Sequence, residues 1–253
     1  MPHLRTTPLW ALINGFAALG AVASVLISRQ PEFFSHWRLT SSDWGWVLFA
    51  AGLGGVLAYP LNRWVLANWG SRSMLYRFGT AGGALLAAIP WLPGLPALLA
   101  AVFLQGVIYN GVSVATNHQA AQWELHQGRR MMGRLHATFF LGSVLSALLS
   151  SLLAALGVGL VLHMAGVGLV VAWLHRSAAL SLDTVPAPTP APGGGPTHGK
   201  AGGLALGLLL GWCTVLESGV MGWASVYLSQ GLKAGDSLSG MGLAAFSGAM
   251  ALG

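Results

Sequence analysis

The sequence predicts an all-α membrane protein, and three observations point to that fold class. Hydrophobic residues make up 55% of the 253 positions and charged residues only 7%, with a mean hydropathy of +0.67. A soluble domain carries roughly 25% charged residues, so the charge content excludes a soluble globular fold. The 36 glycines and 11 tryptophans are typical of membrane helices and membrane interfaces. The apolar residues also form runs of about 20 positions, the length of a helix that crosses a bilayer.

Apolar windows of about 17 to 25 residues predict seven complete helical spans in chain order. They cover positions 9–28, 43–62, 76–93, 95–116, 136–157, 158–175 and 204–229. Very short turns join the third span to the fourth and the fifth to the sixth, so each of these pairs is predicted to be a helical hairpin. The first run is longer than the apolar part of a signal peptide, and we expect it to remain as a span.

A last apolar run begins at Leu238 and holds about 16 residues, roughly 24 Å of helix against a hydrocarbon core of about 30 Å. A charged carboxyl terminus at that depth would cost several kcal/mol. We therefore expect a chain that is truncated at its carboxyl end, within an eighth span.

The Lys and Arg residues are unequally divided between alternate loops, and this division predicts the orientation. Nine lie on one side: Arg5, Arg63, Arg72, Arg77, Arg129, Arg130, Arg134, Arg176 and Lys200. Three lie on the other: Arg29, Arg38 and Lys233. Because cytoplasmic loops carry the excess of positive charge, the amino terminus is predicted to be cytoplasmic.

A segment rich in Pro, Gly and Thr separates the sixth predicted span from the seventh. It covers positions 178–201 and predicts a cytoplasmic linker, because it has almost no side chains to bury. Positions 1–177 are then expected to form an amino-terminal six-helix transmembrane bundle. Positions 202–253 are expected to begin a second bundle. Two-bundle transporters have this layout after their first bundle.

Two loops on the predicted cytoplasmic side carry recognisable motifs. The loop after the second span, "GGVLAYPLNRWVLANWGSRSML", resembles the glycine and arginine signature of the major facilitator superfamily (MFS). The matching residues are Gly55, Pro60, Arg63, Gly70 and Arg72. In that signature a glycine lets two helices approach and a basic turn pins their cytoplasmic ends. The aspartate usual in the signature is absent here, so its charge relay is not carried over.

The loop after the fourth span resembles a bacterial MFS branch that is distantly related to fucose permease. The matching residues there are Asn117, Glu124 and His136, with Arg134 just before the histidine. In the seventh span the match continues at Glu217, Gly219 and Trp223, while Gly222 replaces a usual aspartate. The resemblance implies an MFS-like first six-helix bundle plus span seven and part of span eight.

Glu217 is predicted to lie near the middle of the bilayer, in a run from Gly202 to Leu228 that contains no other charge. A bare carboxylate there costs at least about 2.5 kcal/mol, so it is expected to be protonated or partnered. It is interpreted as a proton carrier or a hydrogen-bond acceptor for a solute. The alternative is a protonated side chain that ties two helices together.

Four other polar residues complete the predicted substrate and proton pathway: Asn14, Asn110, Asn117 and His163. Asn14 and Asn110 lie on spans one and four, which the superfamily's internal repeat relates, and they bind either a solute or a neighbouring helix. His163 is expected at depth in span six, where a neutral imidazole bonded to a backbone carbonyl is the alternative.

Glu124, Arg134 and His136 are assigned, with the first motif, to a cytoplasmic gate. Glu124 is expected to pair with an arginine that it releases when the bundles rock. The plainer interpretation is a basic loop that only sets the topology, and nucleic-acid binding is not expected because the loop lacks aromatic platforms.

The resemblance implies a secondary active transporter that moves a small polar solute across the inner membrane by alternating access, with proton coupling left open. The alternative is a truncated or non-transporting membrane protein, or a bundle that needs another chain. The sequence has no nucleophile elbow, phosphate loop or metal-ligand spacing, so we expect no enzyme activity, cofactor or metal. The oligomeric state is not predicted.

Overall fold

A computed structural model describes residues 8–182, 200–235 and 238–252, and all secondary structure in these residues is helical. The α-helices are α1 Leu9–Ser28, α2 Gln30–Trp37, α3 Ser41–Leu57, α4 Tyr59–Ala88, α5 Leu95–Gln127, α6 Met132–Ala155, α7 Leu160–Ser181, α8 Lys200–Val226 and α9 Met241–Leu252. A 3-10 turn, η1 Ile89–Trp91, and a π-helical turn, η2 Tyr227–Gly231, complete the described elements. The predicted all-α class is confirmed. Most of the predicted linker, 183–199, lies outside the described residues.

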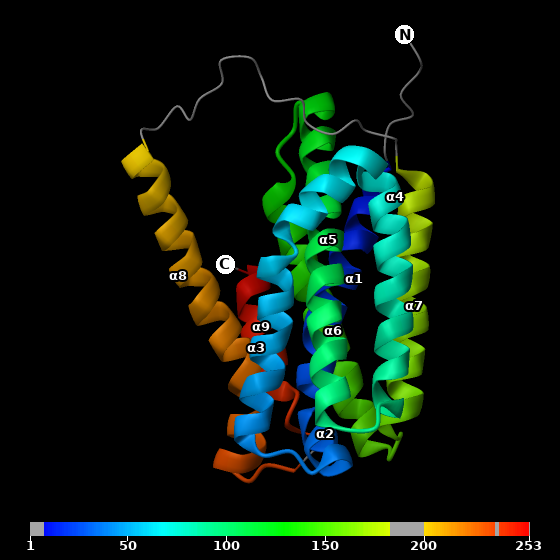
Figure 1. The fold of residues 1–253 in the computed structure, drawn as a ribbon, viewed down its shortest axis with the longest axis vertical. Helices are drawn as coiled ribbons and strands as arrows, with labels where there is room; N and C mark the ends of the chain where they lie inside the picture. The colour runs from blue at the N-terminus through cyan, green and yellow to red at the C-terminus, as the bar shows by residue number, and fades with distance from the viewer. Residues whose placement is uncertain (1–7, 183–199, 236–237, 253) are drawn as a thin grey trace.

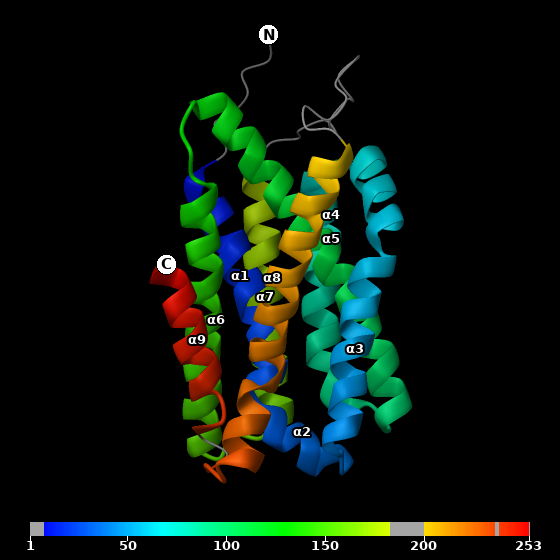
Figure 2. The ribbon, with the colours of Figure 1, turned by 90° about the vertical axis from the view of Figure 1, so that its left-hand side faces the viewer.

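The long helices run side by side along one axis (Figures 1 and 2). We call the end at which α1 and α8 begin and α7 ends the linker end, and the opposite end, with α2, η1 and η2, the α2 end. In the described residues five helical segments are long and apolar enough to cross a membrane, and α3 with α4 pass the same test as a bent pair. The protein is therefore a multi-pass membrane protein. The short helix α2 was not predicted, because its eight residues are not an apolar run.

The predicted loop after the second span is instead helical, and the chain reverses at Gly70. Its φ of 72° and ψ of 159° are accessible to glycine and strained for other residues. Pro60 lies in the first turn of α4, where a missing N–H costs nothing. Past Gly70, Phe78 packs on Gly111 of α5 and Gly82 on Ile108, so α4 runs antiparallel to α5.

Glycines bring the helices of the bundle together in three close pairs. A Cβ at Gly20 of α1 would lie 1.8 Å from the carbonyl oxygen of Phe139 in α6. A Cβ at Gly54 of α3 would lie 2.1 Å from the carbonyl of Phe103 in α5. The third pair, α4 with α7, meets at Gly83 in the same way. Only glycine permits these contacts, which are the small-residue packing that joins helices in membranes.

The first two pairs are built from equivalent positions. Gly20 of α1 contacts Phe139 and Ser143 of α6. Gly106 of α5 lies 86 positions after Gly20, and it contacts Ala51 and Gly55 of α3. Those two residues lie 88 positions before Phe139 and Ser143, respectively. A second pair of contacts shows the same relation: Gly142 contacts Ala17, and Gly54 contacts Phe103. Gly54 lies 88 positions before Gly142, and Phe103 lies 86 positions after Ala17.

The bundle thus contains an internal repeat in which α1 corresponds to α5 and α3 to α6. A shift of 86 positions pairs Asn14 with Ala100, and Asn110 with Ser24. The spans that carry the two asparagines are equivalent, as expected, but the asparagines themselves are not.

Helix α8 is attached to the bundle only toward the α2 end. Residues 202–216 are all exposed, whereas Met221 and Ser225 are buried. Figure 1 shows α8 diverging from the other helices toward the linker end. Helix α9 returns along α6, where the hydroxyls of Ser143 and Ser247 lie 2.9 Å apart. A gap therefore separates α8 from the six-helix bundle at the linker end.

Candidate functional site

Glu217 lies where α8 begins to separate from the bundle. Its side chain is half-buried, between the exposed residues that precede it and the buried Met221 one turn later. Its carboxylate interacts electrostatically with His136 of α6 and with Tyr109 of α5. Glu217 and its two electrostatic partners thus come from three different helices, α8, α6 and α5.

His136 is exposed on α6 and contacts α1. It lies in the second turn of α6, and its ring packs edge-on against Phe16 of α1, with the ring centres 5.3 Å apart. The sequence analysis placed His136 with the arginines of a gate, whereas its electrostatic partner is Glu217. Tyr109 was missed, although a hydroxyl in the middle of an apolar span, next to Asn110, was a usable signal.

Asn110 binds a neighbouring helix. Its Oδ1 accepts a 2.8 Å hydrogen bond from Nδ2 of Asn62, which also donates to the carbonyl of Val107 at 3.2 Å. Asn62 is completely buried in the first half of α4. Asn62 was not predicted as a site residue, because it is the last position of the predicted second span and also belongs to the motif assigned to the loop that follows.

Asn14 and Asn117 are in different surroundings. Asn14 is half-buried on α1 and makes no side-chain hydrogen bond with the described residues. Asn117 donates to the carbonyl of Ser113 at 2.9 Å, one turn earlier in α5. Two residues farther on, Gln119 donates to the hydroxyl of Ser71 at 2.8 Å. This last bond joins the linker end of α5 to the reversal in α4.

His163 has a different electrostatic partner from Glu217. It occupies the fourth position of α7, at the α2 end, and is only 3% exposed. Its electrostatic partner is Arg29, and neither ring nitrogen has a hydrogen-bond partner among the described residues. It therefore lies in the first turn of its helix, and its depth in the bilayer stays a prediction.

The glycine and arginine motif joins α4 to α7. Arg72 donates a 3.4 Å hydrogen bond to the carbonyl of Leu180 near the end of α7, where positive charge is favourable. A second contact joins the same two helices. Arg176 of α7 donates a hydrogen bond to the hydroxyl of Tyr76 in α4, and its guanidinium lies 5.1 Å from the centre of the Tyr76 ring. Arg63 and Arg134 are exposed. A Cβ at Gly55 would meet only ordinary contacts, at 3.7 Å or more.

Glu124 caps a helix. Its Oε1 accepts the backbone N–H groups of Met131 and Met132, the latter at 2.7 Å, at the start of α6. A carboxylate is favourable at a helix amino terminus, where backbone donors are unpaired. It makes no ion pair with an arginine of the described residues, and its electrostatic partner among them is Arg130. In the same residues no three His, Cys, Asp or Glu side chains are placed to hold a metal.

Known transporters resemble this chain in sequence and in fold. It is 31% identical over 222 residues to an uncharacterized MFS-type transporter of Yersinia pestis, covering 85% of this chain and 56% of that protein. It is 28% identical over 141 residues to the uncharacterized transporter y4wD of Sinorhizobium fredii, covering 56% of this chain and 37% of that protein. No family model matches the sequence.

A solved structure of the nucleoside transporter NupG, in a mutant form, superposes with a TM-score of 0.69 at 14% identity, covering 96% of this chain and 63% of that one. This likeness shows a shared fold. The chain spans about half the length of the curated relatives or less. Together the similarities support a membrane transporter.

Proposed function

We propose that the chain forms the first part of a secondary active transporter of the major facilitator superfamily. The MFS-type relative, the transporter fold and the internal repeat of the six-helix bundle support this assignment. The solute is small and polar and crosses the inner membrane by alternating access. Residues 1–177 are the first bundle, and 202–253 begin the second.

The position of Glu217 carries the proposal. With the linker end cytoplasmic, as the arginine distribution predicts, the gap beside α8 opens to the cytoplasm. Glu217 lies where that gap begins, with His136 and Tyr109 as its electrostatic partners. We assign the solute pathway to this gap, which would be open to one side and closed to the other, as in one conformation of an alternating-access cycle.

The surrounding groups favour a solute that donates hydrogen bonds. A carboxylate and a histidine can accept hydrogen bonds, and in the part of the chain that the structure describes no Lys or Arg is an interaction partner of Glu217. An anionic solute would have no compensating cation at this point. Glu217 can also carry a proton in the membrane, where an isolated carboxylate costs at least about 2.5 kcal/mol. Proton coupling is thus assigned to Glu217.

The exposure of α8 favours one alternative, a bundle that needs further helices before it can transport. Residues 202–216 of α8 are exposed and mostly apolar. Helices α8 and α9 alone cannot enclose a solute against the six-helix bundle. Those further helices would come from additional residues of the same protein or from another chain. Uptake measured with the protein produced from its own gene, against uptake with residues 1–253 alone, separates the two cases.

The test of the transporter is uptake in proteoliposomes with an imposed proton gradient, over a panel of neutral, cationic and anionic solutes. Glu217→Gln keeps the shape and removes the titratable group, so it should abolish gradient-driven accumulation and preserve solute exchange. Cys213→Ser, one turn away on α8, is the matched control and should retain both. Accumulation by Glu217→Gln at the rate of the control would refute the role of Glu217, and no uptake of any solute by the protein produced from its own gene would refute the proposed function.

A further inference from the structure

A small cavity lies inside the six-helix bundle, between α1, α4, α5 and α7. Its volume is about 10 Å³, which is about the room that one water molecule requires. Most of its wall consists of apolar side chains and glycines. Three polar side chains also line it: Gln105 and Tyr109 of α5 and His175 of α7. All the lining residues belong to the first bundle, so the cavity lies within that bundle rather than in the gap beside α8.

Two of these polar side chains are buried and have no hydrogen-bond partner. His175 is 2% exposed and Gln105 is 6% exposed. Neither ring nitrogen of His175, nor Oε1 of Gln105, makes a hydrogen bond with the described residues. The carbonyls of Gly15 and Val171 interact with the imidazole, but without hydrogen-bond geometry. An unpaired buried polar atom disfavours folding by about 5- to 150-fold, so both side chains require a partner that the described residues do not supply.

Two glycines of α4 form the wall beside these polar groups. A Cβ at Gly79 would lie 2.3 Å from Cβ of His175 and 3.1 Å from its Nδ1. A Cβ at Gly82 would lie 3.5 Å from Nε2 of Gln105. Positions three apart on a helix face are about 5–6 Å apart, and two atoms that share one bridging water are separated by about 5.5 Å. The absence of side chains at both positions therefore leaves room that suits one water molecule.

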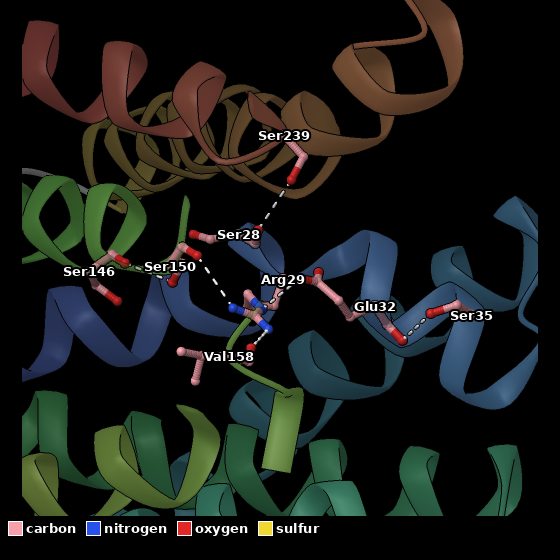
Figure 3. A network of polar contacts seen from close by, with 8 residues as sticks. All are labelled: Ser28, Arg29, Glu32, Ser35, Ser146, Ser150, Val158 and Ser239. Atoms are coloured by element: carbon pink, nitrogen blue, oxygen red, sulfur yellow. Dashed lines mark hydrogen bonds and ion pairs between the residues drawn. The ribbon is translucent and has the colours of Figure 1, made fainter. Parts of the chain in front are cut away.

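Arg29 shows how the protein itself can satisfy a buried polar side chain. It is 1% exposed, and it donates to the carbonyl of Val158 at 2.6 Å and to that of Ser150 at 3.4 Å. Its Nε lies 2.8 Å from Oε1 of Glu32, and Figure 3 shows these partners converging on the guanidinium from three chain segments. No such set surrounds His175 among the described residues, which indicates a partner that is not protein.

We propose that this cavity is a binding site for one water molecule that joins α5 to α7. The water donates one hydrogen to Oε1 of Gln105 and the other to the unprotonated nitrogen of a neutral His175, so both buried acceptors are paired. The hydroxyl of Tyr109 is a hydrogen-bond donor in the same wall, and the water oxygen is free to accept from it. Buried waters are held by two to four polar partners, whereas a purely apolar cavity stays empty.

Tyr109 places this water close to the candidate functional site, because Tyr109 is also the electrostatic partner of Glu217. Bound water therefore lies one side chain away from the proposed proton carrier. The water site does not rest on the proposed function, since its polar groups need a partner whether or not the chain transports a solute.

Water-edited solid-state NMR of the 253-residue chain in proteoliposomes tests the site. His175 is the only histidine in the sequence that is followed by arginine. Labelling histidine with ¹³C and ¹⁵N, and arginine with ¹⁵N, therefore identifies the signals of His175 without a substitution. Magnetisation from water should reach its imidazole nitrogens. The absence of transfer to this ring would mean an empty cavity and would overturn the proposal.

A pair of variants on α5 tests whether the water bridges the two side chains. Gln105→Met keeps the length of the side chain and removes Oε1, so water transfer to His175 should fall at least twofold, although the two side chains share no hydrogen bond. Gln119→Met is the matched control, because Gln119 donates to Ser71 at 2.8 Å and does not line the cavity, and it should leave the transfer unchanged. Equal transfer in these two variants would overturn the bridge.

A second pair of variants fills the cavity instead of removing a polar group. The methyl of Gly82→Ala would lie 3.0 Å from Cγ2 of Ile108 and occupy the space of the water, so transfer to His175 should again fall. Gly166→Ala on α7, where an added Cβ meets nothing within 4 Å, should not change it. Loss of transfer at His175 alone, with the other histidine signals unchanged, supports the site. Full transfer in Gly82→Ala would contradict it.

Discussion

Replacing Arg29 by methionine removes the charge that joins three chain segments at the α2 end. The methionine keeps most of the apolar stem but leaves the carbonyls of Ser150 and Val158 without their donors, and Glu32 without its partner. Breaking a buried pair by removing one member costs about 3–5 kcal/mol. Because the Glu32 side chain is 22% exposed and can be hydrated, the lower part of that range, about 3 kcal/mol, is expected.

Thermal unfolding of the purified protein in one detergent measures this effect. For a chain of this length 1 kcal/mol shifts the midpoint by about 2–4 °C, so Arg29→Met should lower it by about 6–12 °C. Arg38→Gln is the matched control, because Arg38 is exposed at the same end, and a change within about 0.5 kcal/mol is expected. A midpoint for Arg29→Met within 2 °C of the control would refute the reasoning.

Three further predictions concern the bundle. Gly20→Ala should destabilise by at least about 1–3 kcal/mol, because its Cβ would overlap backbone of Phe139, whereas Gly166→Ala, with open space, should be neutral in the same unfolding assay. Asn62→Ala should cost about 1 kcal/mol by deleting an interhelical bond, and a double-mutant cycle with its α5 partner should show the coupling. Glu124→Gln should speed hydrogen exchange of the first amides of α6 and leave those of α1 unchanged; equal exchange in both proteins would contradict the capping role.

The spans could be predicted because hydropathy is a local property, and a run of apolar residues has one stable arrangement in a bilayer. Glu217 could be singled out for the same reason, since one charge in an apolar run is visible without a structure. The reversal at Gly70 could not, because a glycine with positive φ permits helix on both of its sides, and the pattern alone favours a loop.

The partners of the candidate site depended on packing. Tyr109 and Asn62 differ little in sequence context from residues that face lipid or water, and only the arrangement of α4, α5 and α8 brings them to Glu217 and Asn110. His163 shows the same limit. The sequence places it inside a span, and the structure adds that the helix begins only three residues earlier.

Helix α8 is pinned by neutral bonds at one end and unsupported at the other, so it has the mechanics of a lever. Its 27 residues, at 1.5 Å each, make an arm of about 40 Å. A rotation of about 10° at the pinned end would move the free end by about 7 Å, the width of a small solute. Breaking the 3.1 Å hydrogen bond from Trp44 to the carbonyl of Gly222, and the neutral bond from Ser41 to Gln230 at the same end, would then displace α8 mainly at the opposite face of the membrane.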